Sequence, residues 1–326
     1  MPDFLVIGAP KAGTTALHAA LAQHPGLFMS AVKEPKFFLT DGPPPAKGGG
    51  PGDALTYREH IWRRPDYEAL FDAAPPGTLR GESTPLYLYD RAAMRRIRQA
   101  LPAARLIVVV RDPVERAHSN WTHLWSAGLD PVGDFVAACA EEDRRIAAGW
   151  ADFWHYTALG RYGEQLERLY SVFSSDHVFV LRYRALVENP AQVLDRICAF
   201  LGVDQGVIAE VPRENVTAHP QRSLRYHVVS RALRVTSAAS RALPAASALA
   251  ESLERVLQRD ASPRQPLTWQ QRQALLPKFE ADIRLLEVIT GDDYSDWLLP
   301  RGDSGGLVGV RPTGQRQARN GRPREF

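Results

Sequence analysis

Cysteine is scarce in this sequence, since Cys139 and Cys198 are the only two among 326 residues. A disulfide framework or a cysteine cluster able to hold zinc is therefore excluded, and both thiols are expected in the core. Apolar runs are short: none approaches the length of about 18 residues that a membrane span needs, and no signal-type segment stands at the start. These absences predict a cytoplasmic protein with no membrane span.

Acidic residues are missing from one long stretch, although the net charge of +3 is small. No Asp or Glu stands between Glu214 and Glu251, and this stretch contains Arg222, Arg225, Arg231, Arg234 and Arg241. A stretch of one sign suits an anionic ligand, and a solvated helix face is the alternative reading.

The end of the chain has a different composition from the rest. Residues 301–326 carry six arginines against two carboxylates, a charge of +4 that leaves −1 for the remainder. Because this glycine-rich basic tail has few apolar residues, we predict that it is disordered. No nucleic-acid partner is expected for it.

Short strand-like runs alternate with segments of helical periodicity. The strand-like runs are Phe4–Ile7, Thr78–Gly81, Leu106–Val110 and Val178–Leu181. The helical segments include Asp90–Leu101, Glu164–Phe173, Thr268–Ile289 and Pro190–Leu201, the last of which should stop at Gly202. This alternation predicts an α/β fold in which a central parallel sheet lies between helices, with a mostly helical C-terminal third.

We expect one domain over residues 1–300, with one irregular insertion. Residues 41–53, DGPPPAKGGGPGD, are too rich in proline and glycine to form a regular element. This loop is predicted to be flexible, and the sequence leaves open whether it is a mobile lid or a tolerated insertion.

The first strand runs into a glycine-bearing turn, Gly8-Ala9-Pro10-Lys11-Ala12-Gly13-Thr14-Thr15, and then into a helical pattern. Such a turn presents backbone N–H groups and the positive end of a helix to a phosphate. A nucleoside-triphosphate loop would have its lysine directly after the second glycine, where this chain has Thr14. The lysine comes earlier, as Lys11, where it is directed at the bridging oxygen of a 5′-phosphosulfate rather than at a γ-phosphate with its magnesium.

Two motifs carry a resemblance to a known family. Residues 8–21, GAPKAGTTALHAAL, resemble the 5′-phosphosulfate loop of sulfotransferases that use 3′-phosphoadenosine 5′-phosphosulfate (PAPS), particularly the carbohydrate group with the heparan sulfate enzymes. Residues 105–119, RLIVVVRDPVERAHS, resemble the second family signature. The resemblance implies a P-loop-like three-layer sandwich of the α/β class in which Arg111 and Ser119 hold the 3′-phosphate.

The residues of the second signature agree with this implication. Asp112 can cap the helix that follows the strand, and Pro113 suits its first position. Ser119 then lies two turns further along the same face.

Further stretches extend the resemblance from residue 4 to about residue 300. Glu34-Pro35-Lys36-Phe37-Phe38 resembles the family segment whose glutamate is the catalytic base. Residues 81–86, GESTPL, resemble the strand beside it, and residues 160–202 resemble the family's helix–strand–helix.

Two departures concern the acceptor and the late cofactor contacts. Heparan-type members have a lysine where this chain has Ser83. They also carry Lys-Gly-Arg before Ala-His-Pro, where this chain has Asn215-Val216-Thr217. Arg222 is our candidate for the missing positive charge at the cofactor.

The resemblance implies transfer of a sulfuryl group from PAPS to a hydroxyl, with release of adenosine 3′,5′-bisphosphate (PAP). Lys11 and the N–H groups of Ala12, Gly13, Thr14 and Thr15 would stabilise the leaving oxygen, without a metal. Glu34 would accept the proton of the acceptor, with Phe37 and Phe38 desolvating its carboxylate and Lys36 holding it.

Several alternatives stay open. His118 and His123 are the next candidates for the base, although His118 fits a packed helix position better. Aromatic residues after Ser119 suit either an acceptor site or the core; they are Trp121, Trp125, Trp150, Trp154 and Tyr156. The rival functions are a P-loop phosphotransferase (kinase) and a non-catalytic anion- or glycan-binding protein. The acceptor can be a glycan, a glycolipid or another lipid-linked compound, or a small-molecule metabolite.

Overall fold

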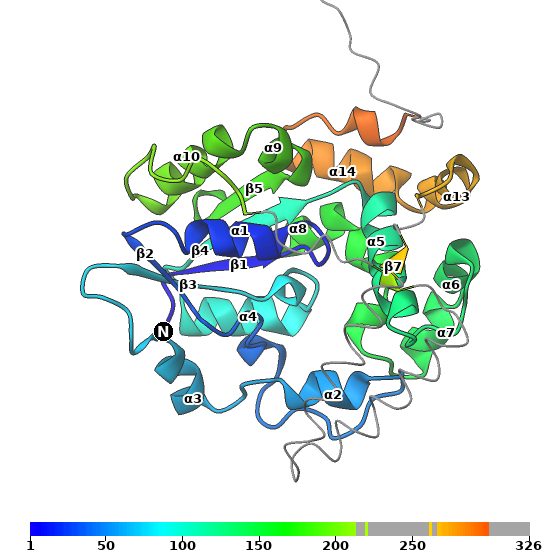
Figure 1. The fold of residues 1–326 in the computed structure, drawn as a ribbon, viewed down its shortest axis with the longest axis horizontal. Coiled ribbons are helices and arrows are strands. Elements are labelled where there is room, and N and C mark those ends of the chain that lie inside the picture. Colours follow the sequence, from blue (N-terminus) through cyan, green and yellow to red (C-terminus); the bar gives the residue numbers. More distant parts are fainter. Residues whose placement is uncertain (213–218, 221–260, 263–265, 300–326) are drawn as a thin grey trace, which may run out of the picture.

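The computed structural model describes residues 1–212, 219–220, 261–262 and 266–299, and a parallel five-stranded sheet forms its centre (Figure 1). The strands are β1 Phe4–Gly8, β2 Leu27–Met29, β3 Leu79–Ser83, β4 Arg105–Val110 and β5 Val178–Arg182. Their order is β2-β3-β1-β4-β5, with every neighbouring pair parallel. Two further residue pairs, His219–Pro220 (β6) and Ala261–Ser262 (β7), form a short antiparallel bridge.

Close packing of the central strands explains why they are so apolar. All five residues of β1 are buried, and so are Leu106–Val110 of β4, as expected of strands covered on both faces. Phe4 pairs with Gly81 of β3 across the ladder. A Cβ atom at Gly81 would lie 2.2 Å from the Phe4 ring, so glycine is required for this approach.

Helices connect the strands on both faces of the sheet. They are α1 Thr14–Leu21, α2 Asp53–Arg58, α3 Arg64–Glu68, α4 Arg91–Ala100, α5 Pro113–Ser126, α6 Phe135–Ala140, α7 Glu142–Ala147, α8 Tyr162–Tyr170, α9 Tyr183–Glu188, α10 Pro190–Leu201, α13 Trp269–Leu275 and α14 Glu280–Thr290. From β1, the chain passes through α1 toward β2, whereas from β3 it passes through α4 in the opposite direction to β4. Right-handed crossovers in opposite directions place their helices on opposite faces, which gives the predicted three-layer sandwich.

Most predicted elements are confirmed, with ends that differ by at most three residues. Helix α4 begins where predicted because the Asp90 carboxylate accepts hydrogen bonds from the N–H groups of Ala92 and Ala93, both at 2.7 Å. Helix α10 ends at Gly202, whose φ of 73° is in the left-handed region. Strand β2 was missed, since three residues are too few to show a periodic pattern.

One helix was predicted wrongly. Thr268–Ile289 forms two helices, α13 and α14, separated by a 3₁₀ turn at Leu276–Lys278. Pro277 explains the break, because proline has no N–H to donate and its ring clashes with the preceding turn. The predicted basic tail at 301–326 and Arg222 lie outside the described residues.

The Pro/Gly-rich loop contains no regular element up to Gly52, as predicted, and Asp53 begins α2. Its far end is tied to the rest of the chain through the buried Asp53 carboxylate. This carboxylate accepts hydrogen bonds from the N–H groups of Gly50 (2.7 Å) and Ala151 (2.9 Å) and from Trp154 Nε1 (2.8 Å). The last residue of the loop is therefore anchored rather than free.

The aromatic region after Ser119 packs around a buried ion pair. Arg145 of α7 binds Asp130 through two hydrogen bonds of 3.0 Å, and Tyr156 donates a third at 2.6 Å. The guanidinium also lies over the rings of Trp150, Trp154 and Tyr156, at 5.2–5.4 Å from their centroids. Of the five aromatic residues named from the sequence, Trp121, Trp154 and Tyr156 are buried and Trp125 and Trp150 are half-buried, so the region belongs to the core.

Both cysteines lie in the interior of the protein. Cys139 and Cys198 are buried and unpaired, as predicted. Within the described part of the chain, no helix combines the length and the apolar character that a membrane crossing requires.

The Asp130–Arg145 pair leads to a stability prediction. Asp130→Asn leaves the wholly buried Arg145 charge without its counter-ion, so we expect a loss of about 3–5 kcal/mol in the free energy of unfolding. The matched control is Asp66→Asn, which breaks an exposed pair with Arg63 and should cost less than about 1 kcal/mol. Urea unfolding measures both, and equal losses would contradict the assignment.

Candidate functional site

The residues singled out from the sequence follow the carboxyl ends of the strands. Because the strands are parallel, these ends lie on the same side of the sheet. The loop with Lys11 follows β1, Glu34 follows β2, and Arg111 follows β4. Since β1 lies between β3 and β4, its loop is central, with the β2 and β3 ends on one side and the β4 and β5 ends on the other. A direct contact joins two of these loops: Arg111 Nη1 donates to the Lys11 carbonyl oxygen at 3.3 Å.

The turn after β1 has the geometry of an anion site. Gly13 is the N-cap of α1 with φ 90°, and no side chain caps that helix end. Lys11 also has a positive φ, of 65°, which bends the turn back on itself. First-turn N–H groups without a capping side chain carry partial positive charge and bind anions. Ala12 and Thr14 are buried, whereas Gly13, Thr15 and Lys11 are partly exposed.

Tyr183, which the sequence reasoning did not single out, packs against this turn. A Cβ atom at Gly13 would lie 2.7 Å from the Tyr183 ring, so the turn and the ring are in close contact. The Arg111 guanidinium lies over the same ring, 4.8 Å from its centroid. Tyr183 follows β5 directly, but no sequence pattern distinguishes it from an ordinary strand-end aromatic residue.

Helix α5 places Ser119 on the same side as Arg111. The Asp112 carboxylate accepts from the N–H groups of Val114 and Glu115, both at 3.1 Å, so it caps the helix as predicted. From Arg111 to Asn120, the partly exposed residues are Arg111, Glu115 and Ser119, at a spacing of four. A spacing of four places these three residues on one face of the chain entering α5, and that face is partly exposed.

Glu115 was also missed, and it changes the electrostatics of this face. Its Oε2 atom lies 3.3 Å from Arg111 Nη2, so the guanidinium has a carboxylate partner in the described chain. A 3′-phosphate bound to Arg111 would share the guanidinium with this carboxylate.

Glu34 lies on the other side of the central turn, in a strained backbone conformation. Its φ is 61°, and its N–H donates to the Ser83 carbonyl oxygen at 2.9 Å. The carboxylate is about one-third exposed and pairs with Lys33 Nζ at 2.5 Å. The prediction that Lys36 holds the Glu34 carboxylate was wrong. Lys33 holds it, and Lys36 Nζ binds Glu59 at 2.8 Å instead.

Phe37 and Phe38 pack into the aromatic core rather than standing alone beside Glu34. The Phe37 ring stacks on Tyr67 with centroids 4.2 Å apart, and Phe38 lies edge-on to Tyr67 and Tyr87 at 5.6 Å. Their desolvating effect on Glu34 stays a prediction.

His18 and Ser83 form a polar contact close to Glu34 that the sequence did not reveal. His18 Nδ1 lies 2.9 Å from Ser83 Oγ, which stands where heparan-type members have a lysine. Burial, together with the charge of Lys33, lowers the pKa of His18 to about 4, so the imidazole is neutral at pH 7.

The two histidines proposed as alternative bases differ in their surroundings. His118 is buried between the rings of Trp121 and Phe135, at 5.6 and 5.0 Å, as expected for a packed helix residue. His123 is partly exposed one turn beyond Ser119 and contacts the Phe153 ring at 5.8 Å.

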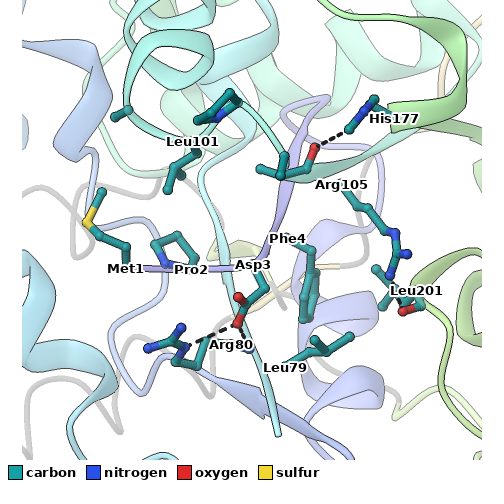
Figure 2. A pocket seen from close by; sticks show the side chains of 14 residues that line it. Met1, Pro2, Asp3, Phe4, Leu79, Arg80, Leu101, Arg105, His177 and Leu201 are labelled. Carbon is teal, nitrogen blue, oxygen red and sulfur yellow. Dashed lines mark hydrogen bonds and ion pairs between the residues drawn. The ribbon is translucent and has the colours of Figure 1, made fainter. Parts of the chain in front are cut away.

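Cavities lie at both edges of the sheet. One cavity, of about 530 Å³, lies at the beginnings of the strands, at the opposite end of β1 from the turn with Lys11. Figure 2 shows the residues that line it, among them Asp3, Phe4, Arg80 and Arg105. A cavity of about 190 Å³ lies on the β4–β5 side and includes Arg111, Glu115 and Tyr183. Another of about 530 Å³ lies on the β2–β3 side, lined in part by Leu39, Thr40 and Leu86.

Metal ligands are not gathered in the described ranges: no group of three or more His, Cys, Asp or Glu side chains there is arranged to hold an ion.

Comparison with known proteins agrees with the fold. A model of the sulfotransferase family matches residues 52–206, a range that begins after the turn with Lys11 and after Glu34. Heparan sulfate glucosamine 3-O-sulfotransferase 6 of Homo sapiens is 30% identical over 207 residues, which cover 63% of this chain and 54% of that protein. Heparan sulfate glucosamine 3-O-sulfotransferase 3B1 of Mus musculus is 31% identical over 204 residues, which cover 62% and 46%.

The chain spans about half the length of these relatives, whereas one solved structure matches it almost completely. The crystal structure of a sulfotransferase from Alicyclobacillus acidocaldarius is 26% identical, with a TM-score of 0.70, and the match covers 92% of this chain and 99% of that one. The chain is therefore similar to sulfotransferases, and the curated relatives named here are enzymes of the heparan sulfate group.

Proposed function

We propose that this chain transfers the sulfuryl group of PAPS to a hydroxyl and releases PAP. The observation that carries the proposal is the central position of the turn after β1, with Arg111 on one side and Glu34 on the other. A donor with phosphates on the 3′ and 5′ oxygens of its ribose and an acceptor with a proton to lose need this division. The relatives' names, which refer to sulfotransferases, support it.

The donor would lie across the turn and the β4–β5 side. Lys11 and the N–H groups of Ala12, Gly13, Thr14 and Thr15 would bind the 5′-phosphosulfate. Arg111 and Ser119, which share one face of the chain entering α5, would bind the 3′-phosphate. Tyr183 would limit the pocket through its contact with Gly13 and Arg111. Arg222 stays a proposed cofactor contact.

In the transfer step, the acceptor oxygen forms a bond to sulfur while the bond from sulfur to the 5′-phosphate oxygen breaks. Negative charge then develops on the phosphate oxygen, where Lys11 and the N–H groups of the turn can stabilise it. Glu34 accepts the proton that the acceptor loses. Its pairing with Lys33 orients the carboxylate, and the hydrogen bond from the Glu34 N–H to the Ser83 carbonyl oxygen holds the backbone.

The kinase alternative fits these residues less well. The position after Gly13, where a triphosphate loop has its lysine, is Thr14. A non-catalytic binding protein would not need the strained backbone at Glu34, which costs free energy and is typical of functional positions.

The cavity on the β2–β3 side is the candidate acceptor pocket, and its charge favours one acceptor class. Leu39 and Thr40 continue the segment that carries Glu34. The charged residues that line this cavity are three carboxylates and one guanidinium: Asp41, Asp90, Asp152 and Arg96. A neutral or amine-bearing hydroxyl compound therefore suits this pocket better than a polyanionic glycan.

The pKa values in this pocket agree with its negative potential. Burial raises the pKa of Asp152, and the neighbouring carboxylates of Asp90 and Asp53 add to the rise. His60, whose pKa burial lowers to about 4, contributes no positive charge at pH 7.

The donor assignment predicts selective binding of the bisphosphate. PAP should raise the melting temperature by mass action on the folded state, and AMP should do so far less because it lacks the 3′-phosphate. Arg111→Ala should weaken PAP binding about 10–100-fold without altering AMP binding, as expected for loss of a charge-assisted contact. Differential scanning fluorimetry measures both, and equal stabilisation by PAP and AMP would sink the 3′-phosphate site.

The chemical assignment predicts that binding and turnover can be separated. Glu34→Gln preserves shape but removes the base, so turnover should fall by about 10²–10⁴ with PAP affinity unchanged. Lys11→Ala should lower affinity and turnover together, the latter by about 10²–10³. Product is detected by mass spectrometry as transfer from PAPS across a panel of hydroxyl acceptors, with EDTA present. Normal turnover of Glu34→Gln would move the base to another residue, and a strict need for ATP and magnesium would favour the kinase.

The acceptor assignment predicts discrimination by charge. A neutral hexoside should react with a kcat/KM at least about tenfold above that of the corresponding hexuronide, a difference of about 1.4 kcal/mol. Asp90 caps α4, so the informative variant is Asp41→Asn at the exposed rim, which should reduce the discrimination. A preference for the hexuronide would show that the acceptor binds elsewhere.

A further inference from the structure

Glu82, the fourth residue of β3, is a wholly buried carboxylate with hydroxyl partners. Its Oε1 atom accepts a hydrogen bond from the Tyr67 hydroxyl at 3.2 Å, and Oε2 accepts one from Thr84 Oγ1 at 2.9 Å. Burial raises the pKa of Glu82 to about 7, although hydrogen bonds from Thr84, Tyr87 and Tyr67 act in the opposite direction. An ionisable group held in this way is costly, and the transfer chemistry described above does not use it.

The same hydroxyl groups hold the backbone that carries Glu34. The N–H of Lys36 donates to Thr84 Oγ1 at 3.3 Å, and the N–H of Phe38 donates to the Tyr87 hydroxyl at 3.3 Å. A hydroxyl group has one proton and two lone pairs. When the proton is donated to Glu82, the lone pairs are left to accept from a backbone N–H. The Glu82 carboxylate therefore sets the direction of the hydroxyls that accept from this segment.

Ring stacking adds a third connection between Glu82 and the segment. Tyr67, which donates to Glu82, stacks on Phe37 with an interplanar angle of 7°. Residues 36, 37 and 38 are thus each joined to Glu82 through one intermediate side chain.

The segment needs such support because its backbone is strained at two residues. Glu34 and Lys36 have φ angles of 61° and 60°, in the left-handed region that side-chain-bearing residues rarely adopt. Residues in this region persist where surrounding contacts fix them. Loss of the contacts at Lys36 and Phe38 would allow the segment to relax, and Glu34 would move with it.

We propose that Glu82 is a positioning residue whose ionised carboxylate fixes the hydroxyl network that holds Glu34 in place for proton transfer. This inference rests on the proposed function, since it concerns the same reaction. Protonation puts a donor on Glu82, so that one of its oxygens no longer accepts from a hydroxyl and the network must reorient. The titratable groups that face Glu82 are Tyr67 from α3, Tyr87 from the turn after β3, and Glu34 itself.

The position of β3 agrees with this role. The strand ends beside the central turn, and the N–H of Thr84 donates to the Val6 carbonyl of β1 at 3.1 Å. A change at Glu82 therefore acts on the acceptor side of the site, whereas the residues proposed to bind the donor follow β1 and β4.

Glu82→Gln tests the proposal because glutamine, like the protonated acid, is uncharged and has a donor group in place of one of the two acceptor oxygens. The probe is PAPS alone, with water as the acceptor and PAP formation as the readout. We expect the variant to be about 10-fold slower than the parent at pH 8 and within about twofold of it at pH 6, where the parent is itself protonated. PAP affinity should be unchanged at both pH values.

The matched control is Asp282→Asn, a second buried carboxylate. Burial raises the pKa of Asp282 as well, but its carboxylate accepts from the N–H groups of Gly163 and Glu164 and belongs to the α8–α14 contact. This variant should keep the pH dependence of the parent. If the loss of any buried carboxylate changed the pH dependence, Asp282→Asn would change it as well.

Hydrogen exchange provides a second measurement that needs no turnover. Amides of residues 34–38 should exchange faster in Glu82→Gln than in the parent at pH 8, and no faster at pH 6. Parental exchange and a parental pH profile in Glu82→Gln would overturn the proposal. Absence of PAP binding and PAP formation in the parent would instead contradict the proposed function.

Discussion

Parallel pairing of β1 with β3 on one side and β4 on the other is the constraint on which the site depends. It is fixed by burial: β1 has no exposed residue, and Phe4 packs so closely on Gly81 that no side chain fits there. Because parallel strands end at the same edge, the three following loops must meet. The turn with Lys11 thereby contacts Arg111 on one side, while Glu34 is bound to the end of β3 on the other.

The two sides of this edge differ in how they are held. On the β4–β5 side, Asp112 caps α5 and forms a buried ion pair with Arg272, and neither Arg111 nor Ser119 has a positive φ. On the β2–β3 side, the backbone is strained at Glu34 and Lys36 and is stabilised by a buried carboxylate with hydroxyl partners. Strained backbone costs stability and is typical of functional positions, so the strain at Glu34 is consistent with a role for this side in the proposed proton transfer.

Sequence patterns predicted the parts of the fold that local rules determine. Strands with buried apolar runs, the Asp112 cap and the stop at Gly202 all follow from their own residues. Strand β2 and the break at Pro277 were missed, the first because it is short and the second because a long periodic pattern outweighed one proline. Tyr183 and Glu82 reach the site through contacts with segments distant in the sequence, which no local pattern reveals. Lys33 is the sequence neighbour of Glu34, and the sequence does not show whether Lys33 or Lys36 pairs with the carboxylate.

A crystal structure of the chain with PAP bound tests the central claim most directly, because it shows which side of β1 the nucleotide occupies. The account predicts that the 5′-phosphate lies on the N–H groups between Ala12 and Thr15 and the 3′-phosphate between Arg111 and Ser119, leaving Glu34 accessible. A nucleotide bound on the β2–β3 side, or a 3′-phosphate away from Arg111, would contradict it.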